Sequence, residues 1–192
     1  MNIALYGNCQ TRALFFYIKK LQPNANIKWI CADLFFDRLK HNWAHTKEFE
    51  GKIVESLYNI DESIDFVKTS DLIIYQNIDV SRSPQINQDI IKQNVKQGIN
   101  LISFASYYYQ PSSKKPLEGM IARETGVKLS ISAVELIKNN PNIDSVDRPN
   151  HPNVHYFLDL CDAICTIMNW SKFSENDKKE LLEEGYPFSL KC

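Results

Sequence analysis

The first hundred residues alternate between short apolar runs and segments whose apolar residues recur at helical spacing. The runs Ile3–Tyr6, Asn26–Cys31, Asp71–Tyr75 and Asn100–Phe104 predict four strands. Continuous apolar residues, as in the third run, are typical of a parallel strand covered on both faces. Because strands alternate with helices, the sequence predicts a three-layer α/β fold. Its mainly parallel sheet has about four to five strands flanked by helices.

Three helices are expected between these strands. The first ends before Pro23 and carries an apolar stripe made of Leu14, Tyr17, Ile18 and Leu21. A short capped helix is expected over residues 61–67. A third should begin at Ser83-Pro84, because serine suits the N-cap and proline the first turn. Its apolar residues would be Ile86, Ile90 and Val95, with Gly98 just past its end.

Three stretches lack a clear period. Residues 32–51 have a partial helical pattern and are expected to form an excursion that contains a helix. Gln76–Asp79 directly follows the third apolar run and is expected to be a polar loop. Residues 105–116 have the composition of a loop that leaves the carboxyl end of a strand. Open α/β sheets bind ligands at that edge.

The C-terminal third is predicted to be rich in helix. Ser132 and Glu135 have the spacing of a capping box, so a helix is expected from there to about Lys138. A long helix follows, with Pro152 in its first turn. Its stripe consists of Val154, Phe157, Leu158, Cys161, Ile164, Cys165 and Met168. A last helix should be capped at Ser174 and stop near Gly185. No repeat or linker occurs, so one domain over residues 1–192 is expected.

Composition and charge narrow the class of protein. Apolar residues make up 44% of the 192 residues, which is ordinary for a soluble globular protein. The net charge of -1 gives no support for binding nucleic acid or a membrane surface. No apolar run approaches the roughly 20 residues of a membrane span. The chain enters its first strand directly, without the pattern of a signal peptide, so a cytoplasmic location is expected.

Cys9 has the local context of a reactive thiol. The chain has five cysteines, at positions 9, 31, 161, 165 and 192, without a C-x-x-C pair, which favours free thiols. Cys161 and Cys165 belong to an apolar stripe and are expected to be core residues. Cys9 comes where the first helix begins. Partial positive charge and backbone N–H groups there favour the thiolate. The alternative is a small buried residue behind a tight turn.

A nucleophilic cysteine requires a base and oxyanion donors. His151 stands at the start of the long helix and is the preferred base, with Asp147 as the residue that could orient it. The Cys9 N–H and the side chain of Gln76 or Asn77 are candidate oxyanion donors. The four histidines are His41, His45, His151 and His155. His155 could instead pair with Asp159 on the helix surface.

A metal site is the competing interpretation of these histidines. His151 and His155 have i, i+4 spacing, and His41 and His45 repeat it. The motif lacks the glutamate of H-E-x-x-H and an obvious third ligand, so no metal is expected. Arg12 lies in the first helical turn, where a cation opposes the helix dipole, which suggests that it serves an anion or pairs with a carboxylate of the protein. Tyr107–Tyr109, Lys114 and Lys115 could stack a base and meet a phosphate in the loop after the fourth strand.

Two motifs together resemble a known family. Gly7-Asn8-Cys9-Gln10 after an N-terminal strand, with His151-Pro152-Asn153 opening a late helix, resembles the WcbI-type polysaccharide biosynthesis family. That resemblance implies capsule assembly, coenzyme A binding and an acetyltransferase role. It implies that Cys9 and His151 are catalytic. The residues implied to bind the coenzyme are Gly7, Asn8, Gln10, Arg12, Tyr107, Lys114 and Lys115.

The same layout is similar to that of SGNH/GDSL-type hydrolases. Cys9 would take the place of their serine, Asn77 that of their asparagine, and His151 that of their base. The sequence departs from that pattern because G-D-S is missing and Asp147 and His151 are four residues apart.

Three functions therefore remain open at the level of sequence. The first is an acyl (acetyl) transferase that uses acetyl-CoA and acts on a sugar or polysaccharide precursor, with a Cys-His active site. The second is an SGNH-like esterase or hydrolase with a cysteine nucleophile and water as the acceptor. The third is a non-catalytic protein that binds coenzyme A or sugar. The partners expected are a small-molecule acyl donor and a carbohydrate acceptor. The sequence does not reveal the oligomeric state.

Overall fold

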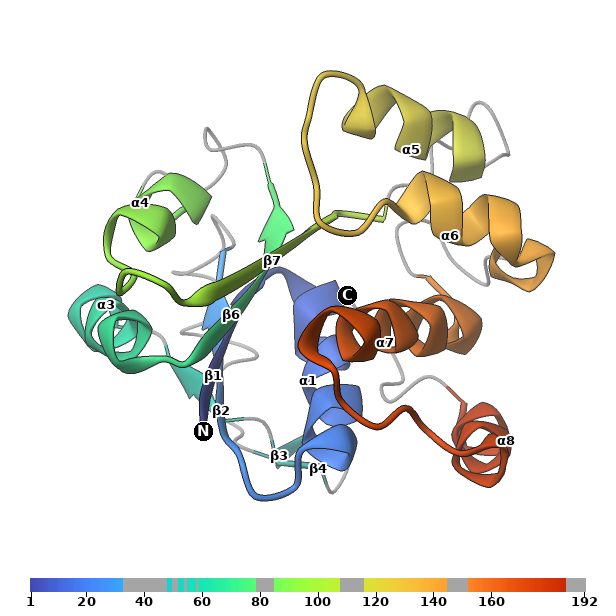
Figure 1. The fold of residues 1–192 in the computed structure, drawn as a ribbon, viewed down its shortest axis with the longest axis horizontal. Coiled ribbons are helices and arrows are strands. Elements are labelled where there is room, and N and C mark those ends of the chain that lie inside the picture. Colours follow the sequence, from blue (N-terminus) through green and yellow to red (C-terminus); the bar gives the residue numbers. More distant parts are fainter. Residues whose placement is uncertain are drawn as a thin grey trace. The chain divides into compact units, whose positions relative to one another are not determined.

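The protein forms two compact units, Met1–Ser103 and Phe104–Cys192 (Figure 1). A computed structural model describes residues 1–32, 48–49, 52–53, 55–57, 59–78, 85–107, 116–144 and 152–185. The expected helix within residues 33–47 lies outside the described residues. The single domain expected over residues 1–192 stays a prediction.

A sheet of five parallel strands organises the first unit, which confirms the predicted fold class. The strand order is β5-β2-β1-β6-β7. Register pairs Gly7 with Cys31 and Tyr6 with Tyr75, so the carboxyl ends of β1, β2 and β6 lie at one edge of the sheet. The strands are β1 (Asn2–Gly7), β2 (Asn26–Cys31), β5 (Ser56–Leu57), β6 (Leu72–Asn77) and β7 (Asn100–Ala105).

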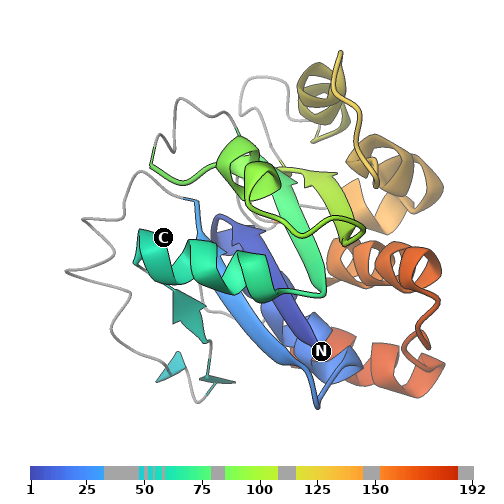
Figure 2. The same cartoon turned by 60° about the vertical axis from the view of Figure 1, so that its left-hand side comes forward.

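Helices cover both faces of this sheet. Helix α1 (Cys9–Leu21) lies on one face, and α3 (Ile60–Thr69) and α4 (Gln88–Gln93) lie on the other (Figures 1 and 2). Successive strand residues point to opposite faces. Ala4 and Tyr6 therefore share a buried core with residues of α3 and α4. The alternate residues of β1 are also fully buried, which explains its continuous apolar pattern.

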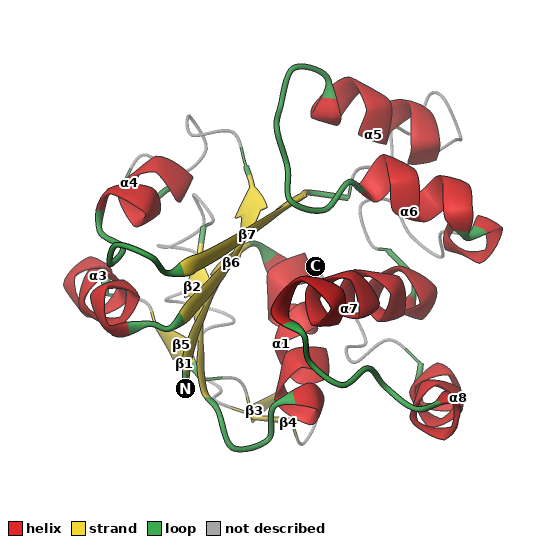
Figure 3. Cartoon of the chain, viewed as in Figure 1, coloured by secondary structure: helices red, strands yellow, loops and turns green. Residues whose placement is uncertain are grey.

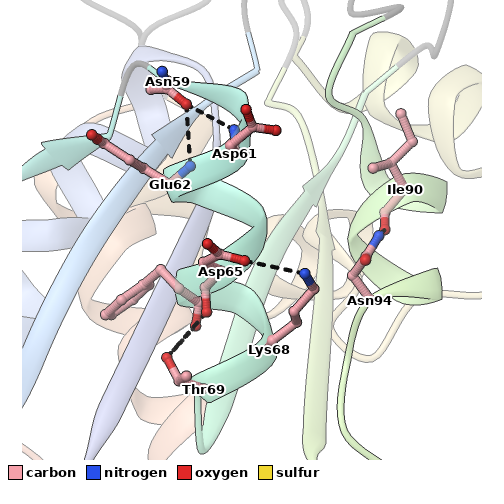
Figure 4. A network of polar contacts seen from close by, with 9 residues as sticks. Asn59, Asp61, Glu62, Asp65, Lys68, Thr69, Ile90 and Asn94 are labelled. Carbon is pink, nitrogen blue, oxygen red and sulfur yellow. Dashed lines mark hydrogen bonds and ion pairs between the residues drawn. The ribbon is translucent and has the colours of Figure 1, made fainter.

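Helix α3 shows why short polar signals are sufficient to place a helix. The Asn59 side chain accepts hydrogen bonds from the backbone N–H groups of Asp61 and Glu62, at 2.8 and 3.2 Å (Figure 4). Two carboxylates in the first turn and Lys68 in the last match the helix dipole. Lys68 also pairs with Asp65 at 3.1 Å. The capped helix expected over residues 61–67 is confirmed.

Helix α4 begins later than the sequence indicated. Ser83-Pro84 lies outside the described residues, and the N-cap is Asn87, whose side chain accepts from Asp89 N and Ile90 N at 3.0 and 3.1 Å. The predicted start was wrong because a second capping residue competes with the serine. Asn94 closes the helix by donating to the Ile90 carbonyl at 2.8 Å (Figure 4). Val95, predicted to be helical, therefore lies beyond the end.

Two other expectations near the sheet are corrected. Gln76 and Asn77 were expected in a loop, but both belong to β6. Gln76 is fully buried, and the pairing of adjacent strands outweighs the polar character of the two side chains. Within the stretch of unclear period, Glu48–Phe49 (β3) and Lys52–Ile53 (β4) form an antiparallel pair.

Helices dominate the second unit (Figure 3). Helix α6 contacts α5 and α7, and α8 contacts α7. The buried stripe of α7 follows the predicted pattern up to Cys165, with Met168 partly exposed. No helix among the described residues is long and apolar enough to cross a membrane. The elements are α5 (Pro116–Glu124), α6 (Ala133–Asn139), the 3-10 helix η2 (Pro141–Asp144), α7 (Val154–Met168) and α8 (Glu175–Glu184).

Capping explains the helix boundaries of this unit. Ser132 caps α6 as predicted. The carboxylate of Glu124, from the end of α5, adds bonds to Ala133 N and Val134 N at 2.6 and 3.2 Å. Ser174 caps α8 with a complete capping box, and Gly185 follows its last residue, as expected. Asn153 caps α7, so Pro152 precedes the helix. The prediction that Pro152 lies in the first turn was wrong.

Two fully buried tyrosines differ in the bonding of their hydroxyl groups. Tyr6 donates to the Ile86 carbonyl at 3.1 Å. The Tyr156 hydroxyl has no hydrogen-bond partner among the described residues. Burial, with smaller contributions from Glu124 and Tyr107, raises the pKa of Tyr156 well above its ordinary value, so this hydroxyl stays neutral. A neutral buried group without a partner loses its bonds to water on folding.

We therefore expect Tyr156→Phe to raise the free energy of unfolding by about 1 kcal/mol. Tyr6→Phe is the matched control and should lower it by about 1 kcal/mol, because it removes a buried hydrogen bond. Urea unfolding of both variants measures the two changes. A loss of stability in Tyr156→Phe as large as that in Tyr6→Phe would contradict this expectation.

Candidate functional site

The candidate site is the turn Gly7–Gln10, where β1 ends at the carboxyl edge of the sheet and α1 begins. Asn8 is the N-cap of α1, and its side chain accepts from Gln10 N at 2.9 Å. Cys9 is the first residue of the helix, as predicted, and it is partly exposed. The Asn8 carbonyl accepts from Thr11 N and Arg12 N at 3.0 and 3.1 Å. The sequence thus places the thiol at a well-capped helix N-terminus.

A buried amide from β6 fixes this turn. The Gln76 Oε1 atom accepts from Asn8 N at 3.0 Å and from Thr11 Oγ1 at 3.2 Å. Its Nε2 atom donates to Gln10 Oε1 at 2.8 Å. Gln76 and Thr11 are fully buried, and Gln10 is nearly so. One side chain therefore connects three successive parts of the turn to the neighbouring strand.

Gly7 leaves the space that this amide occupies. A Cβ atom on Gly7 would lie 1.9 Å from Thr11 Oγ1 and 2.7 Å from Gln76 Oε1. The Gly7 carbonyl accepts from Trp29 Nε1 at 3.1 Å and from Ala32 N at 3.0 Å. The close approach of strand, helix and amide requires a residue without a side chain at this position.

Arg12 is part of the packed interior behind the turn. Only 6% of its surface is exposed. Its guanidinium carbon lies 5.8 Å from the centre of the Trp29 ring, a cation–π arrangement. The same tryptophan donates to the Gly7 carbonyl, so Trp29 contacts both the cation and the turn.

The two candidate oxyanion donors on β6 lie in different environments. The amide of Gln76 is hydrogen-bonded to residues of the turn, and its side chain is fully buried. Asn77 is the last residue of β6 and is partly exposed. The register of β6 with β1 pairs Tyr75 with Tyr6, so the carboxyl end of β6, with Asn77, lies at the edge where the turn begins. Asn77 is thus on the same edge as Cys9, while Gln76 holds the backbone beneath it.

The other described cysteines are buried. Cys31 ends β2 opposite Gly7, and Cys161 and Cys165 lie on the buried side of α7. Burial raises the pKa of both α7 thiols, with the partner cysteine next in importance for Cys161 and Asp162 for Cys165. The predicted core role of Cys161 and Cys165 is consistent with this burial.

The remaining predicted residues belong to the second unit or lie outside the described residues. Tyr107 is 1% exposed, and its ring packs edge-on against Tyr156 with centroids 5.2 Å apart. A ring in this position is a core group and offers no exposed face to an adenine. The Asp159 carboxylate, expected to pair with His155, accepts from Asn140 Nδ2 at 2.8 Å. The predicted residues outside the described part are His41, His45, Tyr108, Tyr109, Lys114, Lys115, Asp147 and His151.

The Cys9–His151 pairing therefore stays a prediction.

The sequence analysis did not identify Thr11 and Trp29, which hold the turn. Polar residues inside an otherwise buried segment are the signal that could have found Thr11, because buried polar groups require hydrogen-bond partners. No local signal identifies Trp29, since an aromatic residue in a strand usually indicates core packing.

Comparisons with known proteins do not assign this chain to a family. The chain matches no family model and no curated protein. Among the described residues, no group of three or more His, Cys, Asp or Glu side chains could hold a metal ion.

Proposed function

We propose that this protein is an acyltransferase that moves an acetyl group from acetyl-CoA to a hydroxyl group of a sugar or polysaccharide precursor. The nucleophile is Cys9. The observation that supports this proposal is the partly exposed Cys9 at the first residue of α1, in a turn whose neighbouring residues are held by the buried Gln76. A reactive cysteine benefits from such a position, because the helix N-terminus favours the thiolate.

The proposed chemistry has two steps. His151 removes the Cys9 proton, and the thiolate attacks the carbonyl carbon of acetyl-CoA. The bond from that carbon to the coenzyme sulfur breaks, and the coenzyme thiolate takes the proton from His151. In the second step His151 removes the proton of the sugar hydroxyl, whose oxygen attacks the acyl-cysteine. The carbon–sulfur bond to Cys9 then breaks, and the thiolate is restored.

The carboxyl edge of the sheet supplies further groups for this reaction. In each step negative charge develops on the acyl oxygen, which needs fixed hydrogen-bond donors. The proposal gives that role to the Asn77 side chain and the Cys9 N–H group. By the resemblance to the WcbI-type family, Lys114 and Lys115 would meet the phosphates of the coenzyme.

The test uses acetyl-CoA as the probe. Calorimetry of the full-length protein should detect binding of acetyl-CoA. Acid quenching after mixing, followed by mass spectrometry of peptides, should find one acetyl group on Cys9. The variant Cys9→Ala should lose this label, whereas Cys31→Ala should keep it, because Cys31 is buried beneath the turn. Release of coenzyme thiol should rise when a sugar acceptor is added.

Each failure has a separate meaning. Absence of acetyl-CoA binding would overturn the transferase proposal. Unchanged turnover in Cys9→Ala would show that Cys9 is not the nucleophile, and it would favour direct transfer to the acceptor. Coenzyme release at the same rate without any sugar would identify water as the acceptor and the protein as a thioester hydrolase.

A further inference from the structure

We infer that the groove between α6 and α7 binds a neutral polyhydroxyl ligand, of the chemical class of a sugar ring. The groove lies within the second unit, and each residue that lines it is among the described residues. The inference goes beyond the proposed function, because it requires no reaction at Cys9.

The groove has the size and composition of a small-molecule site. Helices α6 and α7 lie next to each other (Figure 1), and the groove that they form with Lys172 has a volume of about 430 Å³. Leu136 of α6 and Ala163 of α7 supply apolar surface. Ligand sites of about 300–1,000 Å³ combine such apolar surface with a few polar groups, and this groove falls within that range.

Hydrogen bonds hold several of the polar side chains that line the groove. Asn140 Nδ2 donates to Asp159 Oδ2 at 2.8 Å, and Asn140 Oδ1 accepts from Asn142 N at 3.1 Å. Asp162 Oδ2 accepts from Lys178 Nζ at 2.9 Å. Side chains that are already held in place lose little conformational freedom when a ligand binds, which favours affinity.

The charges of the lining side chains nearly cancel. Asp162 is paired with Lys178, and both side chains are about three-quarters buried. Asp159 and Lys172 then remain as one anion and one cation. Glu175 also lies 3.5 Å from Lys178, but its side chain is 90% exposed, so its charge is screened by solvent. A charged ligand of either sign would meet a group of its own sign in the groove, whereas a neutral ligand would not.

The hydrogen-bonding groups match hydroxyl groups. The carboxylate of Asp159 only accepts hydrogen bonds, the ammonium of Lys172 only donates them, and the amide of Asn139 does both. A hydroxyl group also does both, so neighbouring hydroxyls of one ring can satisfy this mixed set. The C–H groups of such a ring can contact Leu136 and Ala163. These features together favour a polyhydroxyl ring over a phosphate or an amine.

The test is titration of the full chain with sugars, followed by amide NMR spectra. The first probe is a mixture of the methyl glycosides of glucose, galactose and mannose. It should shift the amide signals of Asn139, Asp159 and Ala163, with a dissociation constant of about 1 mM for a ligand of so few atoms. The corresponding amino sugars and uronic acids have the same rings with a positive or a negative charge, and they should bind more weakly.

Two variants test the position of the site. Ala163→Phe fills the groove and should weaken binding by about tenfold or more. Ala122→Phe makes the same change at an exposed position of α5 and should leave the affinity unchanged. Lys172→Met removes a hydrogen-bond donor and should weaken binding about fivefold. Its control is Lys179→Met on α8, where the lysine is 77% exposed.

Three outcomes would overturn the inference. The first is that the neutral mixture shifts none of these three amide signals. The second is that the amino sugars or the uronic acids bind more tightly than the neutral glycosides. The third is unchanged affinity in Lys172→Met, which decides the question alone if circular dichroism shows that Ala163→Phe is not folded. Absence of acetyl-CoA binding would overturn the proposed transfer and leave this result intact.

Discussion

Replacing Gly7 by alanine is expected to lower the free energy of unfolding by about 3 kcal/mol, toward the upper end of overpacking effects. The new Cβ atom would lie 1.9 Å from Thr11 Oγ1 and 2.7 Å from Gln76 Oε1. Thr11 lies in the first turn of α1, and Gln76 is the residue before the last in the neighbouring strand. Neither side chain can yield without breaking its hydrogen bond to the other. The substitution therefore adds a clash and removes part of the network.

Urea unfolding, followed by circular dichroism, measures this effect. Gly126→Ala is the matched control, because Gly126 has a φ of 76° and no atom within 4 Å of the added Cβ. It should lose only about 1 kcal/mol, the cost of a left-handed backbone in alanine. If Gly7→Ala is no less stable than this control, the tight fit at the turn is refuted. Adding Thr11→Ala to Gly7→Ala should recover part of the loss, since it removes the nearest atom.

The second large effect is expected for Gln76→Leu, which should lower the free energy of unfolding by about 3 kcal/mol. Leucine fills a similar volume but leaves Asn8 N, Thr11 Oγ1 and Gln10 Oε1 without the bonds that Gln76 provides. Each of these bonds lies in a buried or partly buried site. An unsatisfied buried polar group costs about 1–3 kcal/mol, so the combined loss exceeds that of an ordinary hydrogen bond.

Gln88→Leu provides the comparison within the same unit. Gln88 is 8% exposed, and its Oε1 atom accepts from Ile78 N at 3.3 Å. Loss of this single, longer bond should cost about 1 kcal/mol. Equal stability of the two leucine variants in urea unfolding would mean that the Gln76 network does not stabilise the turn. In Gln76→Leu, Cys9 should also be alkylated at more than one rate, because the hydrogen bonds of Gln76 no longer hold the start of α1.

The sequence predicted elements whose signals are local. The cap of α8 at Ser174, the apolar stripe of α7 and the continuous run of β6 each depend on neighbours along the chain. The start of α4 was missed because Ser83 and Asn87 both suit an N-cap, and a local rule does not choose between two good caps. The position of the turn between β1 and α1 was predicted, but its internal bonding was not. Nothing within Leu72–Asn77 states that Gln76 will meet Asn8 and Thr11 across the sheet.

In the turn Gly7–Gln10, some features follow from the local sequence and others depend on the tertiary structure. By itself the sequence predicted that a strand would end just before Gly7 and that a helix would begin at Cys9. These features arise from apolar periodicity, which depends on neighbours along the chain. Only the tertiary structure decided that Gln76 and Trp29 would hold this turn and that Arg12 would be buried behind it. Those contacts depend on the register of β1 with β2 and β6, which brings together residues that are far apart in the chain.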